Sequence, residues 1–404
     1  DGKRPLCSPC HRSKRECLWP TTETPSTSPR LPQGHQTLDF KSTDDPEVAL
    51  QNIEVFSLFR HYITTLASWY DLNDRHRHFT DLVPVKARRN PLLLSAILAF
   101  SAASKQPTDR HEVERAAFYH FESVRILLRI TSNAQDVVSN GEVLAAICLL
   151  RSYEIISENL SSQSHLQGCY SLLASQPINL HSNLVRAAFW NYLREDITVA
   201  LIERRELMIE LSDDHLPRNL EADDDYANYI TVLLGQIINQ CFGNADHVDL
   251  LEWSALRKRI IDWRHSLPAS FTPIPVNKEG NFEFAGTLCG WHAAALQYFQ
   301  TAFIILELAK PKGQMTTTEN MKQITNLTRE LETRASEICA LALSSDSQAV
   351  WINAFGPIAF CGCWLRDQNK ITEILKGVQE WGALTGWPVS DIIQSLKANT
   401  SAAE

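Results

Sequence analysis

The sequence lacks any long apolar run and has only three methionines in 404 residues. Its most apolar stretch, residues 91–103, is interrupted by serines and falls short of the ~20 apolar residues that a helix needs to cross a bilayer. No signal peptide pattern opens the chain. We therefore expect a protein without a membrane segment, located inside the cell. Because the first residue is Asp1 and the first methionine is Met208, we also expect the sequence to be a fragment that lacks its true N-terminus.

An excess of positive charge is also missing, since the net charge is −9. A chain that coats nucleic acid along its length needs clustered Lys and Arg, so the overall charge excludes that class. The charge is uneven, however: residues 1–17 carry a local charge of +3, which leaves −12 for the remainder. The five basic side chains are Lys3, Arg4, Arg12, Lys14 and Arg15. Only this end of the chain is suited to binding anions.

Strand patterns and common enzyme signatures are absent. We find no run of alternating apolar and polar residues bounded by Asn-Gly turns, which predicts an all-α fold. The phosphate-binding G-x-x-x-x-G-K, the G-x-G-x-x-G loop and the G-x-S-x-G elbow are missing, and His111-Glu112 lacks the second histidine of H-E-x-x-H. The sequence therefore does not indicate an enzyme. An all-α enzyme with a site between helices is kept as an alternative that a turnover assay would distinguish.

Helical periodicity begins at Asp44. Asp44 and Asp45 can cap a helix, Pro46 suits its first turn, and apolar residues recur at helical spacing from Ile53 to Trp69, which predicts one helix of about six turns. Further helices are predicted at about 91–105, 110–131, 138–157, 162–175, 182–204, 226–242, 249–265, 285–309, 319–344, 348–365, 370–382 and 390–398. No repeat of fixed period is present, so the sequence does not predict a regular solenoid.

The ten cysteines fall into two groups. Seven are dispersed in mostly apolar surroundings, where a reduced thiol acts as a small core residue, and this favours a reducing compartment. Cys361-Gly-Cys363 has no second Cys or His pair nearby at ligand spacing, so we expect two buried thiols there. The dispersed cysteines are Cys148, Cys169, Cys241, Cys289, Cys339, Cys361 and Cys363.

The other three cysteines, Cys7, Cys10 and Cys17, have the spacing C-x2-C-x6-C. Two thiolates two residues apart in a turn, followed by a third, can occupy three corners of a tetrahedral zinc site, and the neighbouring basic residues favour the thiolate form. A fourth ligand is needed, and we expect the side chain of His11, adjacent to Cys10, to point away from the metal. The plain alternative is a basic surface segment with incidental cysteines.

This segment resembles the second half of the fungal binuclear zinc cluster, in which two C-x2-C-x6-C units are joined by a loop that often contains Asp and Pro. The resemblance implies that Cys7 bridges two zinc ions, that Cys10 and Cys17 bind the second zinc, and that Pro5 is the loop proline. It also implies that the first three cysteines, and the residues that read base edges, lie upstream of Asp1. Three thiolates cannot close two tetrahedral sites, so we expect that the sequence as it stands does not fold its DNA-binding module.

The resemblance and the composition together divide the chain into three parts. Residues 1–19 form the partial cluster, and residues 20–45, rich in Pro, Ser and Thr, form a linker expected to be disordered. Residues 46–398 resemble the fungal-specific transcription factor domain that follows many zinc clusters. The stretches that carry this likeness are His61-Tyr62, Trp69 to Asp74, Arg77 to Phe79, Val83-Pro84, Asn90 to Ser101, Phe189 to Ile202 and Thr385 to Pro388.

The family implies a nuclear, sequence-specific regulator of transcription by RNA polymerase II, with zinc as cofactor and double-stranded DNA as partner. Lys3, Arg4, Arg12, Lys14 and Arg15 would contact phosphates, which position a protein on DNA without specifying sequence. Co-regulators or a small-molecule effector would act on the helical domain, no membrane partner is implied, and a homodimer is left open. The alternative from another class is a helical regulator or scaffold that has lost DNA binding.

Three features of the body have both a structural and a functional interpretation. The tryptophans at 69, 190, 263, 351 and 387 are expected in the core rather than stacked on a cofactor. Arg194-Glu195-Asp196 is favoured as an internal ion-pair cluster over the polar end of an effector pocket. The acidic run Glu221 to Asp225 is expected to be a solvated loop rather than a metal or activator contact.

Overall fold

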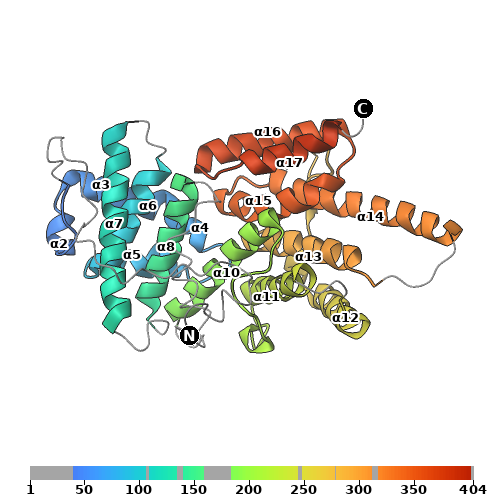
Figure 1. Ribbon diagram of the computed structural model, residues 1–404, viewed down its shortest axis with the longest axis horizontal. Helices are drawn as coiled ribbons and strands as arrows, with labels where there is room; N and C mark the ends of the chain where they lie inside the picture. The colour runs from blue at the N-terminus through green and yellow to red at the C-terminus, as the bar shows by residue number, and fades with distance from the viewer. Residues whose placement is uncertain are drawn as a thin grey trace, which may run out of the picture. The chain divides into compact units, whose positions relative to one another are not determined.

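The structure is a computed structural model that describes residues 40–105, 109–133, 140–158, 183–243, 248–277, 279–311 and 317–401. The chain divides into two units, Asp1–Lys41 and Ser42–Glu404, and the description below concerns the second. Its described residues are almost entirely helical (Figure 1), which confirms the predicted all-α class. The predicted zinc ligands and most of the predicted linker lie outside the described residues, as does the helix predicted at 162–175.

The described residues form helices and two short strands. In order they are α2 (Pro46–Ala49), α3 (Ile53–His61), η1 (Tyr62–Leu66), α4 (Ala67–Tyr70), η2 (His78–Leu82), α5 (Val83–Ala87), α6 (Pro91–Ser104), α7 (Arg110–Asn133), α8 (Gly141–Glu158), α10 (Asn183–Glu203), η4 (Asp213–His215), α11 (Asp223–Phe242), α12 (Leu250–Ser266), η5 (Ala269–Phe271), β1 (Ile274–Pro275), β2 (Ala285–Gly286), α13 (Gly290–Leu308), α14 (Thr317–Leu343), α15 (Gln348–Cys361), η6 (Gly362–Trp364), α16 (Gln368–Thr385) and α17 (Ser390–Ser401).

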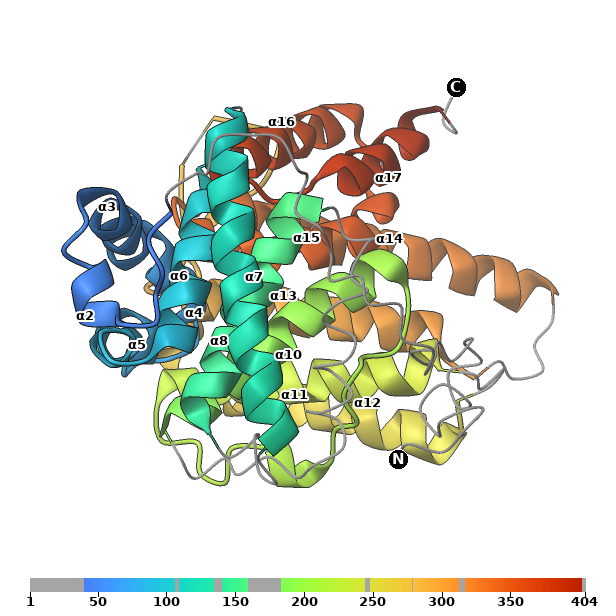
Figure 2. The same cartoon turned by 60° about the vertical axis from the view of Figure 1, so that its left-hand side comes forward.

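Helix α6 forms the centre of the N-terminal half. Its sequence is apolar on nearly all faces, and such a helix must be surrounded by other elements. It packs against α3, α5, α7 and α8, and Figures 1 and 2 both show α6, α7 and α8 side by side. Asn90 caps α6 by accepting the backbone N–H of Leu93, and Pro91 occupies the first helical position.

Helix α10 joins the two halves of the unit. It packs against α8 on one side and against α11 and α15 on the other, and nearly all of its side chains are buried. The C-terminal half is built around α13, which contacts α11, α12, α14 and α15, while α16 and α17 pack against α15 (Figure 2). The start of α10 and the start of α11 therefore lie beside the loop that leaves α4, and this arrangement creates the main cavity.

The single helix predicted from Pro46 to Trp69 is wrong, because the chain turns at residues 50–52 and a new helix begins. Asn52 caps α3, since its side-chain oxygen accepts the N–H groups of Glu54 and Val55 at 2.9 and 3.2 Å. The helix then widens into the π-helical segment η1 before α4. Apolar periodicity detected the helical character of the segment but not the cap in its middle.

The absence of strands was also predicted wrongly. β1 and β2 pair antiparallel, with Ile274 opposite Gly286 and Pro275 opposite Ala285. Strands of two residues are too short to produce an alternating pattern, so the sequence could not reveal them. As a consequence, the helix predicted from residue 285 begins at Gly290, after β2.

Aromatic and cysteine side chains fill the core as expected. The side chains of Trp190, Trp263, Trp351 and Trp387 are buried, and Trp69 is partly buried with its indole N–H donated to Gln348 at 2.7 Å. Cys148, Cys339 and Cys361 are buried free thiols, whereas Cys363 is only partly buried. Burial raises the pKa of the Cys339 thiol to about 12, so this side chain behaves as a neutral apolar group.

Candidate functional site

The sequence-predicted site residues cannot be placed in the structure. Cys7, Cys10, Cys17 and the five basic residues around them lie outside the described ranges, so the zinc and phosphate assignments stay predictions. Within the described ranges, no group of three or more His, Cys, Asp or Glu side chains is arranged to hold a metal ion. The same residues include no helix whose length and apolar character would suit a membrane span.

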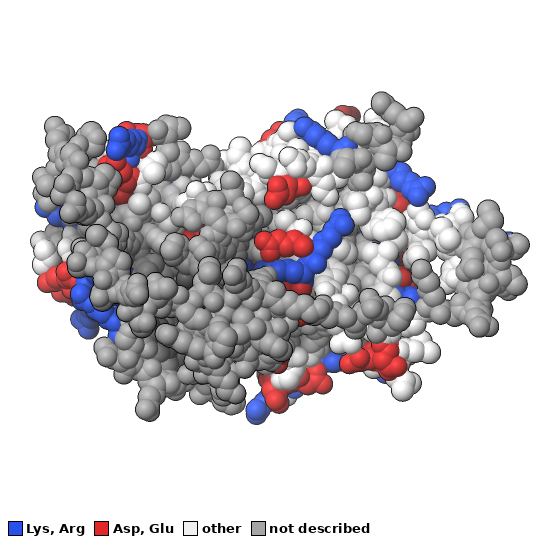
Figure 3. Space-filling model, viewed as in Figure 1, with Lys and Arg blue, Asp and Glu red and all other residues white. Residues whose placement is uncertain are grey.

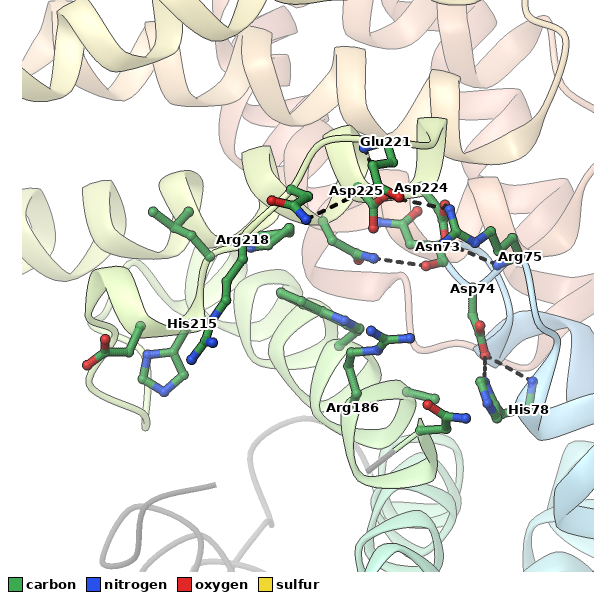
Figure 4. A pocket seen from close by; sticks show the side chains of 18 of the residues that line it. Asn73, Asp74, Arg75, His78, Arg186, His215, Arg218, Glu221, Asp224 and Asp225 are labelled. Carbon is green, nitrogen blue, oxygen red and sulfur yellow. Dashed lines mark hydrogen bonds and ion pairs between the residues drawn. The ribbon is translucent and has the colours of Figure 1, made fainter. Parts of the chain in front are cut away.

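The main cavity of the helical unit has a volume of about 790 Å³ (Figure 4). Four segments form its walls: the loop after α4, the first turns of α10, the connector between α10 and α11, and the first turns of α11. Its lining residues are Asn73, Asp74, Arg75, His78, Asn183, Arg186, Ala187, Trp190, Ser212, Asp214, His215, Leu216, Pro217, Arg218, Asn219, Glu221, Asp224, Asp225 and Asn228. The volume lies within the range of ~300 to 1,000 Å³ that is typical of small-molecule sites.

Two aspartates shape the loop after α4. Asp71 accepts the N–H groups of Phe79 and Thr80, both at 2.9 Å, and so provides acceptors for two N–H groups in the first turn of η2. Burial raises the pKa of the Asp71 carboxyl, although these hydrogen bonds oppose the shift. Asp74 accepts the backbone N–H of His78 at 2.9 Å and lies 2.7 Å from its ring Nδ1. The loop thus presents a rigid polar wall to the cavity.

The acidic run at the start of α11 forms a second wall. It was predicted to be a solvated loop, and for Asp223 to Asp225 this is wrong, because these residues form the first turn of the helix. Carboxylates are favoured there by the helix dipole, and the guanidinium of Arg75 lies 3.2 Å from Asp224 and 3.6 Å from Asp225. Burial raises the pKa of the Asp224 carboxyl while Arg75 opposes the shift.

Arg186 and Arg218 face the cavity from α10 and from the connector (Figure 4). Arg186 is half-buried and Arg218 is exposed. Neither guanidinium makes a hydrogen bond or ion pair with any residue in the part of the chain that the structure describes. This contrasts with Arg75, whose charge is matched by the carboxylates of α11.

Two buried asparagines complete the lining. The side-chain nitrogen of Asn228 donates to the backbone oxygen of Asn73 at 3.0 Å and holds the loop against α11. Among the described residues, neither amide atom of Asn73 has a hydrogen-bond partner, and the side-chain oxygen of Asn228 has none either. Since buried polar groups in proteins are almost always paired, these atoms are suited to a bound molecule.

The cluster Arg194-Glu195-Asp196 is internal, and Glu195 and Asp196 form the ion pairs that were favoured. The guanidinium of Arg194 instead donates to the backbone oxygen of Tyr70 and the side-chain oxygen of Asn191. Arg151 of α8 lies 3.5 Å from Glu195 and 4.0 Å from Asp196, and Arg205 lies 3.2 Å from Asp196. Burial raises the pKa of the Glu195 carboxyl and lowers the pKa of the Arg194 guanidinium. Both residues also line a second cavity of about 40 Å³. That volume has room for only about three waters, which is too little for an effector.

Sequence reasoning missed Arg186, Arg218 and Asn73 as candidate ligand-binding residues. Asn73 falls within a stretch that was singled out for its family likeness, but neither arginine belongs to any motif. The three residues lie on segments far apart in the chain, so only the packing of α10 and α11 against the loop brings them to one cavity.

Charged side chains of the described residues are interspersed on the face shown in Figure 3, where lysines and arginines lie among aspartates and glutamates. The described residues on this face therefore form no continuous basic surface of the kind that a DNA backbone requires.

Comparisons with known proteins place the cavity in a recognised domain. Residues 57–243 match the model of the fungal specific transcription factor domain, and all lining residues, from Asn73 to Asn228, lie within this range. The chain is also similar to "Transcription activator AMTR1" of Alternaria alternata, with 21% identity over 492 aligned positions that cover 85% of this chain. The chain spans only 64% of the length of that relative. No solved structure matches. This part of the chain is therefore similar to a family of transcription factor domains.

Proposed function

We propose that the protein is a zinc-dependent, sequence-specific DNA-binding regulator of RNA polymerase II transcription that acts in the nucleus of a fungus. The main support for this proposal is the order of two features along one chain. A basic segment with the C-x2-C-x6-C spacing comes first, and a region that matches the fungal specific transcription factor domain follows. In this proposal the zinc cluster reads DNA and the helical unit modulates activity. The name of the similar Alternaria alternata protein, a transcription activator, supports activation as the direction of control.

The charge distribution supports this division of labour. Residues 1–17 carry a charge of +3 and the remainder carries −12, so attraction to phosphates is confined to the cysteine segment. The helical unit then has another task, and its main cavity suits the binding of a small-molecule effector.

Zinc would be held by the thiolates of Cys7, Cys10 and Cys17 together with ligands from the first half of the cluster. Zinc bound to thiolates folds such small modules, which have no core of their own. Arg12, Lys14 and Arg15 lie between these cysteines, so closing the cluster would orient them toward the DNA backbone.

The test uses the protein translated from its complete transcript. We expect two zinc ions per chain by elemental analysis, and selection from a random duplex library should yield a defined DNA motif. The variant Cys10→Ser with Cys17→Ser should lose one zinc and most DNA affinity. Cys289→Ser is the matched control, because Cys289 stands at the N-cap position of α13 and belongs to no group of metal ligands within the described residues. Absence of zinc from the unaltered protein would instead favour a helical regulator that has lost DNA binding.

A further inference from the structure

We propose that the main cavity binds a small organic anion, with a carboxylate or phosphate group held by Arg186 and Arg218 and a neutral hydrogen-bonding group held by Asn73 and Asn228. The binding itself does not depend on the proposed DNA-binding function. Its regulatory consequence rests on that function, because a ligand here would act on the helical unit of a transcription regulator.

The charged side chains of the cavity wall indicate the sign of the charge on the ligand. Each buried carboxylate is already satisfied by the protein: Asp74 by His78, and Asp224 by the backbone and side chain of Arg75. Asp225 accepts the backbone N–H groups of residues 221 and 222.

The two remaining acidic groups of the lining, Asp214 and Glu221, are exposed and therefore solvated. Arg186 and Arg218 have no protein acceptor among the described residues, although a guanidinium offers five donors. The lining holds five carboxylates and three guanidiniums, but among its buried and half-buried charged groups only Arg186 has no protein partner within the described residues. Together with Arg218 at the exposed rim, it can offer two guanidiniums to the oxygens of a carboxylate or phosphate.

The unpaired amide atoms of the two asparagines indicate which neutral group the ligand carries. Asn73 is 1% exposed and Asn228 is 5% exposed, and three of their side-chain polar atoms lack a partner among the described residues. An amide left unpaired in the interior is costly, so a hydroxyl or amide of the ligand would recover that cost on binding. Because Arg218 is exposed and Asn73 is buried, the anionic end of the ligand would face the solvent and the neutral end the interior.

The size and the surface of the cavity favour an organic molecule over an inorganic ion. The cavity of about 790 Å³ has room for an organic molecule, and Trp190 and Leu216 add apolar surface beside the polar groups. A metal cation fits poorly, because the carboxylates are engaged and the described residues form no metal-binding group.

A ligand in this position would link two parts of the fold. Arg186 is on α10, whereas Arg218 is on the connector that leads to α11. An anion held by both side chains would fix the connector against α10. This gives the helical unit a structural difference between its free and bound forms.

The first experiment measures binding of two probes, sodium phosphate and citrate, by thermal unfolding and calorimetric titration at constant ionic strength, with chloride as the reference. We expect 10 mM citrate to raise the unfolding temperature of the unaltered chain by roughly 2 °C. Phosphate should give a smaller rise. Arg186→Gln with Arg218→Gln should abolish both shifts. The matched control is Arg60→Gln with Arg366→Gln, because these arginines are exposed, have no side-chain partner in the described ranges and lie away from the cavity.

A second variant, Asn73→Leu, separates binding from folding. The substitution removes an unpaired amide at similar size, so the unfolding temperature in chloride should stay equal or rise, while citrate affinity should fall about fivefold, the worth of one hydrogen bond. The proposal is overturned if neither probe stabilises the unaltered chain, or if the shift persists in the cavity variants. These measurements use neither DNA nor zinc, so their failure is distinct from loss of DNA binding in the Cys10→Ser, Cys17→Ser variant.

Discussion

Both terminal nitrogens of Arg205 lie 3.2 Å from one carboxylate oxygen of Asp196, and the other oxygen accepts the backbone N–H of Met208 at 2.6 Å. Asp196 is fully buried on α10, whereas Arg205 and Met208 belong to the connector that carries His215 and Arg218. One carboxylate therefore anchors the segment that forms a wall of the main cavity.

Removing this anchor should destabilise the protein. In Asp196→Ala, Arg205 would lose its buried partner and the N–H of Met208 its acceptor, so the free energy of unfolding should fall by about 3 kcal/mol. Urea unfolding followed by circular dichroism measures the change. Asp346→Ala is the control, because Asp346 is exposed and its side chain makes no hydrogen bond or ion pair with the described residues. A loss below about 1 kcal/mol would contradict the role assigned to Asp196.

Stability should depend on pH through Glu195. Burial raises the pKa of this carboxyl above its ordinary value of 4.5, with Arg151 opposing the shift. A raised pKa in the fold means that the ionised form is disfavoured there. The free energy of unfolding should therefore increase as the pH falls from the raised pKa toward 4.5, and this increase should end below 4.5.

The variant Glu195→Gln isolates this contribution, since a neutral amide does not titrate and still offers an oxygen to Ser152. The difference in unfolding free energy between the unaltered chain and the variant should change with pH only inside that window. A difference that is constant across the window would show that Glu195 keeps its ordinary pKa in the fold.

The helical class of this protein could be read from the sequence because periodicity is a local property. The apolar residues of 91–103 predict a helix surrounded by others, and α6 is such a helix. Boundaries were less predictable, since the cap at Asn52 lies inside an otherwise regular pattern. The acidic run at Asp223 was misread because charge favours a solvated loop and a helix N-terminus equally well.

The candidate cavity could not be predicted for a different reason. Asn73, Arg186 and Arg218 meet only through the packing of helices far apart in the chain, and no spacing rule connects them. The ion-pair cluster shows the same limit: Glu195 and Asp196 were recognised as internal charges, but their partners Arg151 and Arg205 depend on how α8 and the connector pack against α10.

Close packing of two helices predicts the effect of adding a single methyl group. A Cβ at Gly356 of α15 would lie 2.8 Å from the Cα of Thr198 on α10, and a backbone atom cannot move aside as a flexible side chain can. Gly356→Ala should therefore lower the free energy of unfolding by about 2 kcal/mol, despite the better helix propensity of alanine. Chemical unfolding measures the change in free energy, and Gln379→Ala, at an exposed position, is the control. Equal stability would mean that α15 and α10 are less closely packed than the structure shows.

Differences in burial among the cysteines of the helical unit predict large differences in their rates of alkylation. The Cys339 thiol is 1% exposed and burial raises its pKa to about 12, so both access and thiolate fraction are low. Cys289, at the start of α13, is only partly buried. Burial also raises the pKa of the Cys289 thiol. With iodoacetamide at pH 8, Cys339 should therefore react on the order of a hundredfold more slowly than Cys289, as measured by peptide mass spectrometry. The difference should vanish in denaturant, where both thiols regain their ordinary pKa. If Cys339 reacted as fast as Cys289 in the native protein, the packing of α14 against the core would have to open on the timescale of the reaction.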